Sequence, residues 1–293
     1  MKKALICIVS ALVCWGLEAQ THISKPDLSI PSKVAPAYFG PNAFPVPDML
    51  DGTVSSDLSA EIHYDSFFCT MTDNLTDDVT QDVSVKLTLP LFSPRVNLVI
   101  WMPVVEHFQT TPEVSALRRL SPGSPLSGMD SGDVYVSTDI SLMEQERSGY
   151  DIALRAALKT ASGNSFSTAR VYDAPGYFFD LSAGRDICRF PDGALRVAVS
   201  SGFLCWQTDN GRQNDAVMYG MMTSLTKGRL SADITLGGYV GWEEDGDRPM
   251  TLKSHLSWSF KNFALHLAHQ VGFKDWPYHQ IRFGISYSAP FLK

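Results

Sequence analysis

Residues 281–288 read IRFGISYS, and apolar and polar side chains alternate through the whole stretch. Ile281, Phe283, Ile285 and Tyr287 share one face, and smaller or polar side chains share the other. A period of two with one apolar face is typical of a strand that separates two environments. The same alternation recurs along most of the chain, so we expect a protein built from many amphipathic strands.

The pattern predicts twelve strands, each close to the length that a tilted strand needs to cross a bilayer. They are residues 57–67, 80–90, 95–104, 133–143, 150–160, 176–186, 194–206, 215–225, 229–242, 250–260, 263–273 and 279–289. The third is the weakest prediction, because Val99 and Trp101 interrupt its polar face and Pro103 lacks a backbone donor.

Short and long connections alternate along the chain. The short ones are 91–94, 144–149, 187–193, 226–228 and 261–262, and the others are 68–79, 105–132, 161–175, 207–214, 243–249 and, as a short exception, 274–278. Bacterial outer-membrane barrels have short periplasmic turns and long outer loops. A soluble sandwich shares the hydrophobic alternation but does not explain this alternation of connection lengths.

The first 19 residues have the pattern of a cleaved secretory signal. Lys2 and Lys3 precede the apolar stretch 4–16, and Ala19 ends a cleavage site before Gln20. We therefore divide the chain into a signal peptide (1–19), a proline-rich segment (20–55) and a barrel (56–293). The proline spacing favours extended chain. The favoured interpretation of the segment is a linker, and the alternative is a piece that lies in the barrel mouth or binds a periplasmic partner.

Composition excludes several classes of protein. Cleavage of the leader removes Lys2, Lys3 and Glu18, so 24 basic and 31 acidic residues become 22 and 30, a net charge of −8 that argues against nucleic acid as a partner. Beyond the leader the longest apolar run, Leu98–Val105, is too short for a membrane helix. Three remaining cysteines allow one disulfide at most and match no zinc pattern: Cys69, Cys188 and Cys205.

Aromatic residues recur at the predicted strand ends, where membrane barrels carry their interfacial girdles. One group flanks the tight turn at Lys261 and Asn262, and another lies at the opposite end of the strands. The residues are Trp258, Phe260 and Phe263 for the first group, and Tyr64, Phe67, Phe68, Phe273, Trp276 and Tyr278 for the second.

Residues 55–293 resemble the bacterial outer-membrane β-barrels. The last strand is similar to the assembly signal of that class, with alternate apolar residues out to Phe291, although Pro290 interrupts the alternation and Leu292 and Lys293 follow the aromatic. The resemblance implies an antiparallel transmembrane β-barrel of about twelve strands in a Gram-negative outer membrane. It also implies contact with outer-membrane lipid and with the barrel-assembly machinery, and a porin-like transport function.

A narrower resemblance rests on Gly132–Val134, Ala157–Thr160 with Gly163–Asn164, and Phe179–Gly184. These motifs look like those of the transporter barrels named for the phenol-degradation MetA pathway. That likeness would imply passage of small, hydrophobic compounds.

One stretch of the sequence resembles the active site of a barrel enzyme. Residues 206–212 resemble the active-site strand of outer-membrane phospholipase A, but Trp206 occupies the histidine position, and Thr208 or Asp209 the serine position. A hydroxyl without an adjacent imidazole has no base to activate it. We therefore expect no enzymatic activity here, and a lipid hydrolase is the least favoured of three functions.

The inward faces of the predicted strands carry charges of both signs and three histidines. We expect His255 and His266 to be diagonal neighbours on that face, with hydrogen bonding favoured over metal binding; no cofactor or metal is expected. These side chains are compatible with two functions. The favoured one is a channel with a charged path for a small solute. The alternative is a structural or surface-interaction barrel whose lumen is plugged. The lumen-lining candidates are Glu61, Lys86, Asp139, Asp151, Arg155, Asp180, Arg196, Asp233, Lys253, His255, His266 and Arg282.

Overall fold

The computed structural model describes residues 38–69, 77–164, 168, 170, 175–207, 213–242 and 246–291. The signal peptide and the first part of the proline-rich segment lie outside these ranges. In the described part of the chain no helix is long and apolar enough to cross a membrane.

The described residues form thirteen strands and two short helices. In chain order these are β1 (Asp57–Cys69), β2 (Asp78–Leu91), β3 (Ser93–Thr110), α2 (Pro112–Leu117), β4 (Ser127–Asp130), β5 (Tyr135–Met143), α3 (Gln145–Ser148), β6 (Asp151–Lys159), β7 (Gly176–Phe190), β8 (Gly193–Gln207), β9 (Gln213–Lys227), β10 (Leu230–Gly241), β11 (Met250–Phe260), β12 (Phe263–Lys274) and β13 (Tyr278–Pro290). Each of the twelve predicted strands corresponds to one of them.

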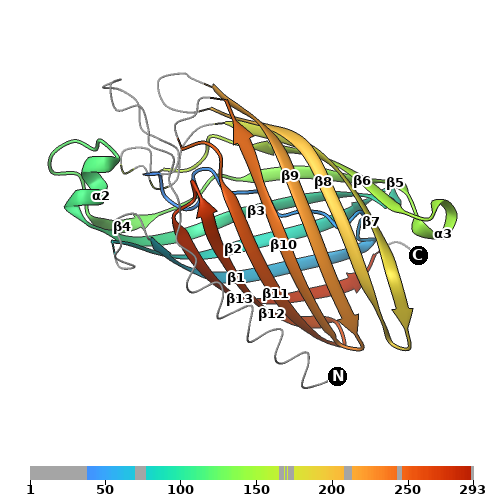
Figure 1. Cartoon of the computed structure of the whole chain (residues 1–293). Coiled ribbons are helices and arrows are strands. Elements are labelled where there is room, and N and C mark those ends of the chain that lie inside the picture. The colour runs from blue at the N-terminus through green and yellow to red at the C-terminus, as the bar shows by residue number, and fades with distance from the viewer. Residues whose placement is uncertain are drawn as a thin grey trace.

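The sheet closes on itself. Each strand of the ring pairs antiparallel with its neighbours, and β1 pairs with both β2 and β13, so the first and last strands meet. Among the described strands β4 stands apart from the ring, since it pairs with the last residues of β3. The remaining twelve strands form a closed antiparallel barrel, which confirms the predicted fold (Figure 1).

The connections sort to the two ends as the sequence indicates. Short turns between β2 and β3, β7 and β8, β9 and β10, and β11 and β12 lie at one end, together with α3, Asp57 and Pro290; we call this the turn end (Figure 1). The longer connections, including the one that carries α2 and β4, lie at the opposite end, which we call the loop end.

The third strand is longer than predicted. β3 continues past Pro103 to Thr110, so part of the predicted loop 105–132 is strand, and the rest contains α2 and β4. The register with β2 shifts here, because Val83 pairs with Val105 whereas Ser84 pairs with Pro103. The extra residue is a β-bulge, which lets the ladder continue past a residue that has no backbone donor.

The outer face of the barrel is apolar. Large side chains such as Ile62, Val199, Met221 and Phe283 point away from the lumen and are more than half exposed. Trp258, Phe260 and Phe263 form an aromatic belt at the turn end, as predicted, and Tyr287 extends it by packing against Phe263. An apolar wall with such a belt is the surface of a barrel that lies in lipid.

Part of the predicted loop-end belt is wrong. Phe67, Trp276 and Tyr278 are buried inside the barrel, where Phe67 packs edge to face against the other two rings. Their parity explains this, because Phe67 lies on the same face of β1 as Asp65, and Tyr278 on the same face of β13 as Arg282. An aromatic near a strand end can therefore belong to the inner face.

Residues 38–56 run through the lumen from the loop end to the turn end. At the loop end the Tyr38 carbonyl accepts a hydrogen bond from Arg118 Nε at 2.6 Å, and the Phe39 carbonyl accepts one from Tyr278. At the turn end the Asp51 carbonyl accepts one from Arg196 Nη2 at 2.9 Å. We call residues 38–56 the lumen segment; the linker interpretation is wrong for them.

Candidate functional site

The candidate site is the lumen itself, and its loop-end half is filled by aromatic side chains. Phe39 and Phe44 of the lumen segment are buried against Tyr135, Trp206 and Tyr239, which point inward from β5, β8 and β10. Phe39 and Phe44 pack edge to face at 5.4 Å, and the Tyr239 hydroxyl donates a hydrogen bond to the Phe44 carbonyl at 3.2 Å. These contacts close the barrel near the loop end.

A buried ion cluster lies beside the aromatic residues. Arg118, which follows α2, and Arg170, in the connection after β6, both pair with Asp78 of β2, and Arg170 also pairs with Glu106 of β3 at 3.3 Å. Asn42 of the lumen segment donates to Glu106 at 2.8 Å. All four charged side chains are fully buried, so each depends on its partners for compensation. The cluster ties the loop end to the segment.

The predicted lumen-lining residues form pairs, three of them between neighbouring strands and one, Asp151 of β6 with Arg196 of β8, across the intervening strand β7. The shortest distances between charged groups are 3.2 Å for Glu61 and Lys86, 2.7 Å for Arg155 and Asp180, 2.7 Å for Asp151 and Arg196, and 2.9 Å for Asp233 and His255. Asp139 lies opposite Arg155 in the β5–β6 register. These pairs explain how a small barrel accommodates many charges on its inner wall.

Two further predicted residues lie close to Asp48 of the lumen segment. Lys253 of β11 donates to Asp48 at 2.6 Å. Arg282 of β13 pairs with Asp65 at 2.7 Å and approaches Asp48 at 4.0 Å. Asp48 therefore brings a negative charge between two cations, and the wall and segment are electrostatically matched.

At the turn end the segment packs closely against the wall. A Cβ on Gly184 of β7 would lie 2.1 Å from the Asp51 carbonyl oxygen, which real side chains never reach. Gly52 has φ +93°, a conformation that favours glycine, and lies against the backbone of Asp151 and Gly184. The backbone of the segment therefore lies directly against the backbone of the wall where the segment reaches the turn end.

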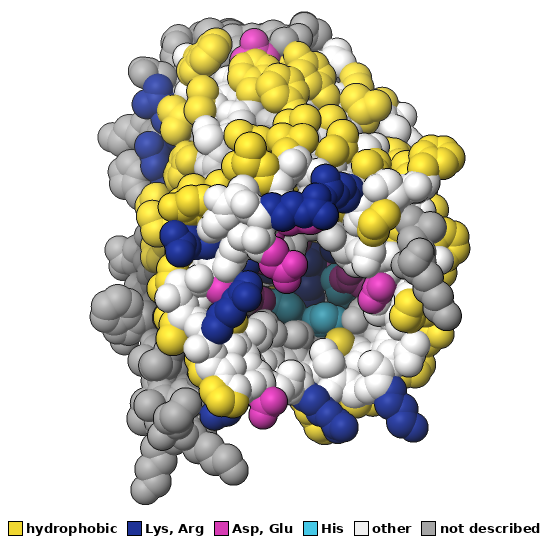
Figure 2. Space-filling model, turned by 90° about the vertical axis from the view of Figure 1, so that its right-hand side faces the viewer, with side chains coloured by type: hydrophobic (Ala, Val, Ile, Leu, Met, Phe, Trp, Pro, Cys, Tyr) yellow, Lys and Arg dark blue, Asp and Glu magenta, His cyan; other side chains and the backbone are white. Residues whose placement is uncertain are grey.

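The rest of the turn-end half is a hollow, which we call the vestibule. Figure 2 shows it as an opening surrounded by apolar side chains and lined by acidic, basic and histidine side chains. The predicted diagonal contact of His255 and His266 lies in this half: His255 Nε2 and His266 Nδ1 are 3.1 Å apart. The described residues contain no group of three or more potential ligands that could hold a metal ion.

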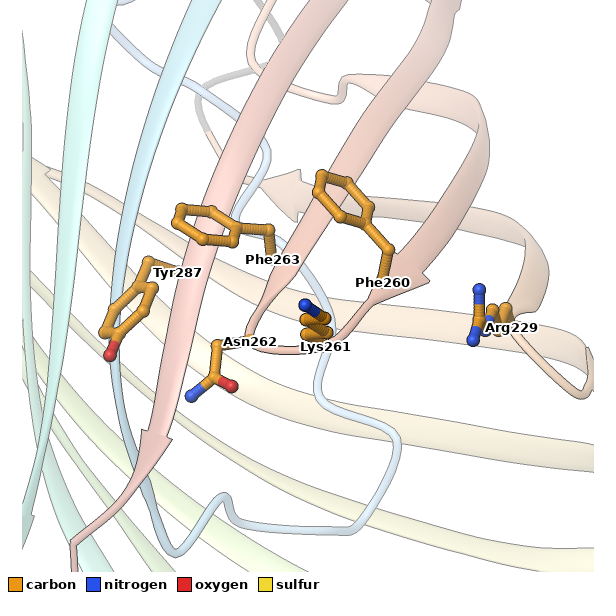
Figure 3. Close-up of a pocket in the computed structure, with 6 residues that line it drawn as sticks. All are labelled: Arg229, Phe260, Lys261, Asn262, Phe263 and Tyr287. Carbon is orange, nitrogen blue, oxygen red and sulfur yellow. The ribbon is translucent and has the colours of Figure 1, made fainter.

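A second hollow lies on the outer surface at the turn end, with a cavity volume of about 610 Å³. Aromatic rings and two cations from neighbouring turns surround it (Figure 3). It is lined by Arg229, Phe260, Lys261, Asn262, Phe263 and Tyr287. Its place in the aromatic belt assigns it to the lipid boundary and separates it from the lumen.

The stretch compared with a phospholipase active site is structural where it is described. Trp206 is buried and packs edge to face against Tyr135 and Phe178. Residues 208–212 lie outside the described part of the chain. Cys69, Cys188 and Cys205 are not joined by disulfides.

Several important lumen residues were not among the predicted ones. Asp48 and Asp51 belong to a segment without periodicity, and Arg118 and Arg170 belong to loops. Period-two analysis finds only residues on strands. The available signal was the density of polar residues in the proline-rich segment, which does not by itself place them inside a barrel.

Comparisons with known proteins support the fold. No family model matches the sequence, and neither does any curated protein. Among solved structures, an outer membrane channel from Pseudomonas putida F1 is 11% identical with a TM-score of 0.56, over 84% of this chain and 100% of that one. The NanC porin is 8% identical with a TM-score of 0.50, over 78% of this chain and 98% of that one.

A third structure, the KdgM porin in complex with disordered oligogalacturonate, is 13% identical with a TM-score of 0.48, over 79% of this chain and 99% of that one. At these identities the likeness to the first two structures establishes the fold alone, that of outer-membrane β-barrels. None of the three is named for the phenol-degradation pathway, and that narrower resemblance stays a prediction.

Proposed function

We propose that the protein is an outer-membrane channel for a small solute. In the resting state the lumen segment closes this channel. The observation that carries the proposal is a ring of twelve strands, apolar outside, whose inner wall is charged and whose vestibule opens at the turn end. Charged side chains that line a pore select the solutes that pass through it. The channels and porins that share the fold support the same function.

The orientation follows from the connections. Short turns face the periplasm in barrels of this class, so the vestibule opens to the periplasm and the aromatic contacts of Phe39 and Phe44 close the outer side. The proposed location is the outer membrane, reached through the cleaved signal peptide and the barrel-assembly machinery, with lipid around the apolar wall.

The segment is held by groups that can separate without unfolding the barrel. The Asp48–Lys253 pair has an exposed carboxylate, so it contributes little on its own. The aromatic contacts of Phe39 and Phe44 contribute more than this ion pair to keeping the segment in the lumen. We therefore propose that displacement of the segment opens the path.

The test is conductance of the full-length protein in planar bilayers. The first variant carries Val46→Cys and Gly237→Cys in a background in which Cys69, Cys188 and Cys205 are replaced by serine. Val46 Cγ1 lies 3.8 Å from the position of a Cβ on Gly237, so oxidation can lock the segment to β10. The second carries Phe39→Ser and Phe44→Ser, which loosen it. Val46→Cys alone is the control.

We expect the loosened variant to conduct and the oxidised variant to be silent until it is reduced. Equal conductance in the oxidised and reduced states would contradict gating by the segment. Silence of the loosened variant, with normal shift in gel mobility on heating, would contradict the channel itself. That result would support the second function, a structural or surface-interaction barrel, which the filled loop end of the lumen favours.

A further inference from the structure

Four side chains on neighbouring strands form a continuous chain of hydrogen bonds in the vestibule. Ser286 Oγ of β13 lies 2.8 Å from His266 Nε2 of β12, and His266 Nδ1 lies 3.1 Å from His255 Nε2 of β11. His255 Nδ1 lies 2.9 Å from Asp233 Oδ2 of β10. We call these four residues the relay.

The register explains why the relay forms. Asp233 pairs directly with His255 across β10 and β11, whereas His255 pairs with Ala268, two residues beyond His266. The next step is also diagonal, since His266 pairs with Gly284, two residues before Ser286. Diagonal neighbours on one face of a sheet are within reach of long side chains.

The carboxylate fixes the direction of the hydrogen bonds. An ionised Asp233 can only accept, so His255 Nδ1–H donates to it, and in the neutral form of His255 the Nε2 atom is then an acceptor. His266 Nδ1–H then donates to His255, and the His266 Nε2 lone pair accepts from the Ser286 hydroxyl. The imidazole of His266 is oriented through its other nitrogen by hydrogen bonds that lead to the carboxylate of Asp233. A hydroxyl that donates to an imidazole oriented in this way is an activated nucleophile.

The surroundings leave the relay accessible from the vestibule. The side chains of His255 and Asp233 are 28% and 21% exposed, and Ser286 is partly exposed. Glu61 lies opposite Ser286 in the β1–β13 register, and its carboxylate lies 3.2 Å from Lys86 Nζ and 3.2 Å from His63 Nε2. Lys86 is 41% exposed and offers a positive charge to a substrate oxygen.

We propose that Ser286 is the nucleophile of an esterase site in the vestibule, with small carboxylic esters as substrates. Ser286 Oγ attacks the ester carbonyl carbon, and its proton passes to His266 Nε2. The bond between that carbon and the alcohol oxygen breaks, and the leaving alcohol takes the proton. Water then attacks the acyl-serine by the same route, which releases the acid and restores the hydroxyl. His255 and Asp233 are positioning residues.

The activity goes beyond passage of a solute and is tested separately from it. The full-length protein, folded in detergent, is treated with a biotinylated fluorophosphonate, and the modified peptide is identified by mass. In parallel, hydrolysis of p-nitrophenyl butyrate is followed. We expect one adduct, on Ser286, and turnover that disappears in Ser286→Ala.

Two further variants test the relay, and one is the matched control. His266→Gln removes the base and should slow labelling by at least ~100-fold, the usual contribution of a general base. Asp233→Asn should slow it and shift its pH profile, which a merely structural role would not do. Ser288→Ala changes a serine on the same face of β13, bonded to Asp57 instead of a histidine, and should label normally.

Folding of each variant is checked by its shift in gel mobility on heating. No adduct on Ser286 in the folded wild type overturns the proposal, and so does labelling that is unchanged in folded His266→Gln and Asp233→Asn. Conductance of Ser286→Ala equal to that of the wild type is expected, so the two functions fail independently.

Discussion

A charge placed on the outer wall should destabilise the barrel according to its depth, and β13 offers a graded series. Ile281, Phe283 and Ile285 point outward and are 37%, 56% and 43% exposed. Tyr287, in the aromatic belt, marks the turn-end boundary of the apolar band. Arginine at each of the three positions, compared with alanine at the same position, isolates the effect of the charge.

The depth of each position follows from strand geometry. A strand that rises about 3.4 Å per residue and is tilted by about 40° advances roughly 2.6 Å per residue along the barrel axis. Ile285 therefore lies about 5 Å inside the belt, Phe283 about 10 Å and Ile281 about 16 Å. The midplane of an apolar band of about 25 Å lies between the last two.

We expect arginine at 283 and 281 to lower the free energy of unfolding by ~2–4 kcal/mol, and arginine at 285 by ~1–2 kcal/mol, since the cost falls toward the boundary. The assay is urea titration of the protein in lipid vesicles, followed by tryptophan fluorescence. Ser288→Arg faces the lumen beside Asp57 and should cost much less. Equal costs at all four positions would refute both the assigned faces and the assigned depths.

Two other variants test how the lumen is held together. Arg170→Met should lower the free energy of unfolding by ~3–5 kcal/mol, because Asp78 and Glu106 lose a buried partner; the same urea titration measures it, and a change below ~1 kcal/mol would contradict the cluster's role. Gly184→Val should displace the Asp51 backbone and increase the reaction of Asp51→Cys with a maleimide added from the turn-end side; unchanged reactivity would mean that the two backbones are not in contact.

Period-two alternation set the positions and faces of the strands, because each strand of the barrel separates lipid from the lumen. A charged residue such as Arg155 and an apolar one such as Leu154 cannot exchange faces without a large loss of stability. The local pattern therefore determines which face of the strand points to lipid. The alternating connection lengths also indicated at which end of the barrel each connection lies. Pro103 misled the prediction of the third strand, because a bulge absorbs a residue without a donor.

The aromatic residues show the limit of local reasoning. Trp258 and Phe263 belong to the lipid belt as expected, whereas Phe67 and Tyr278 are buried inside. Both groups lie near strand ends. Parity along the strand separates them, and proximity to an end does not.

The amino-acid sequence by itself determined the barrel: its strands, their lipid and lumen faces and the end at which each connection lies, since these depend on neighbours in the chain. The tertiary structure decided what fills the lumen and which polar groups meet there. The contacts of Phe44 with Tyr239 and of Asp65 with Arg282 join residues that are distant in sequence. Closure of the ring fixes the register that brings them together, and no local pattern contains that register.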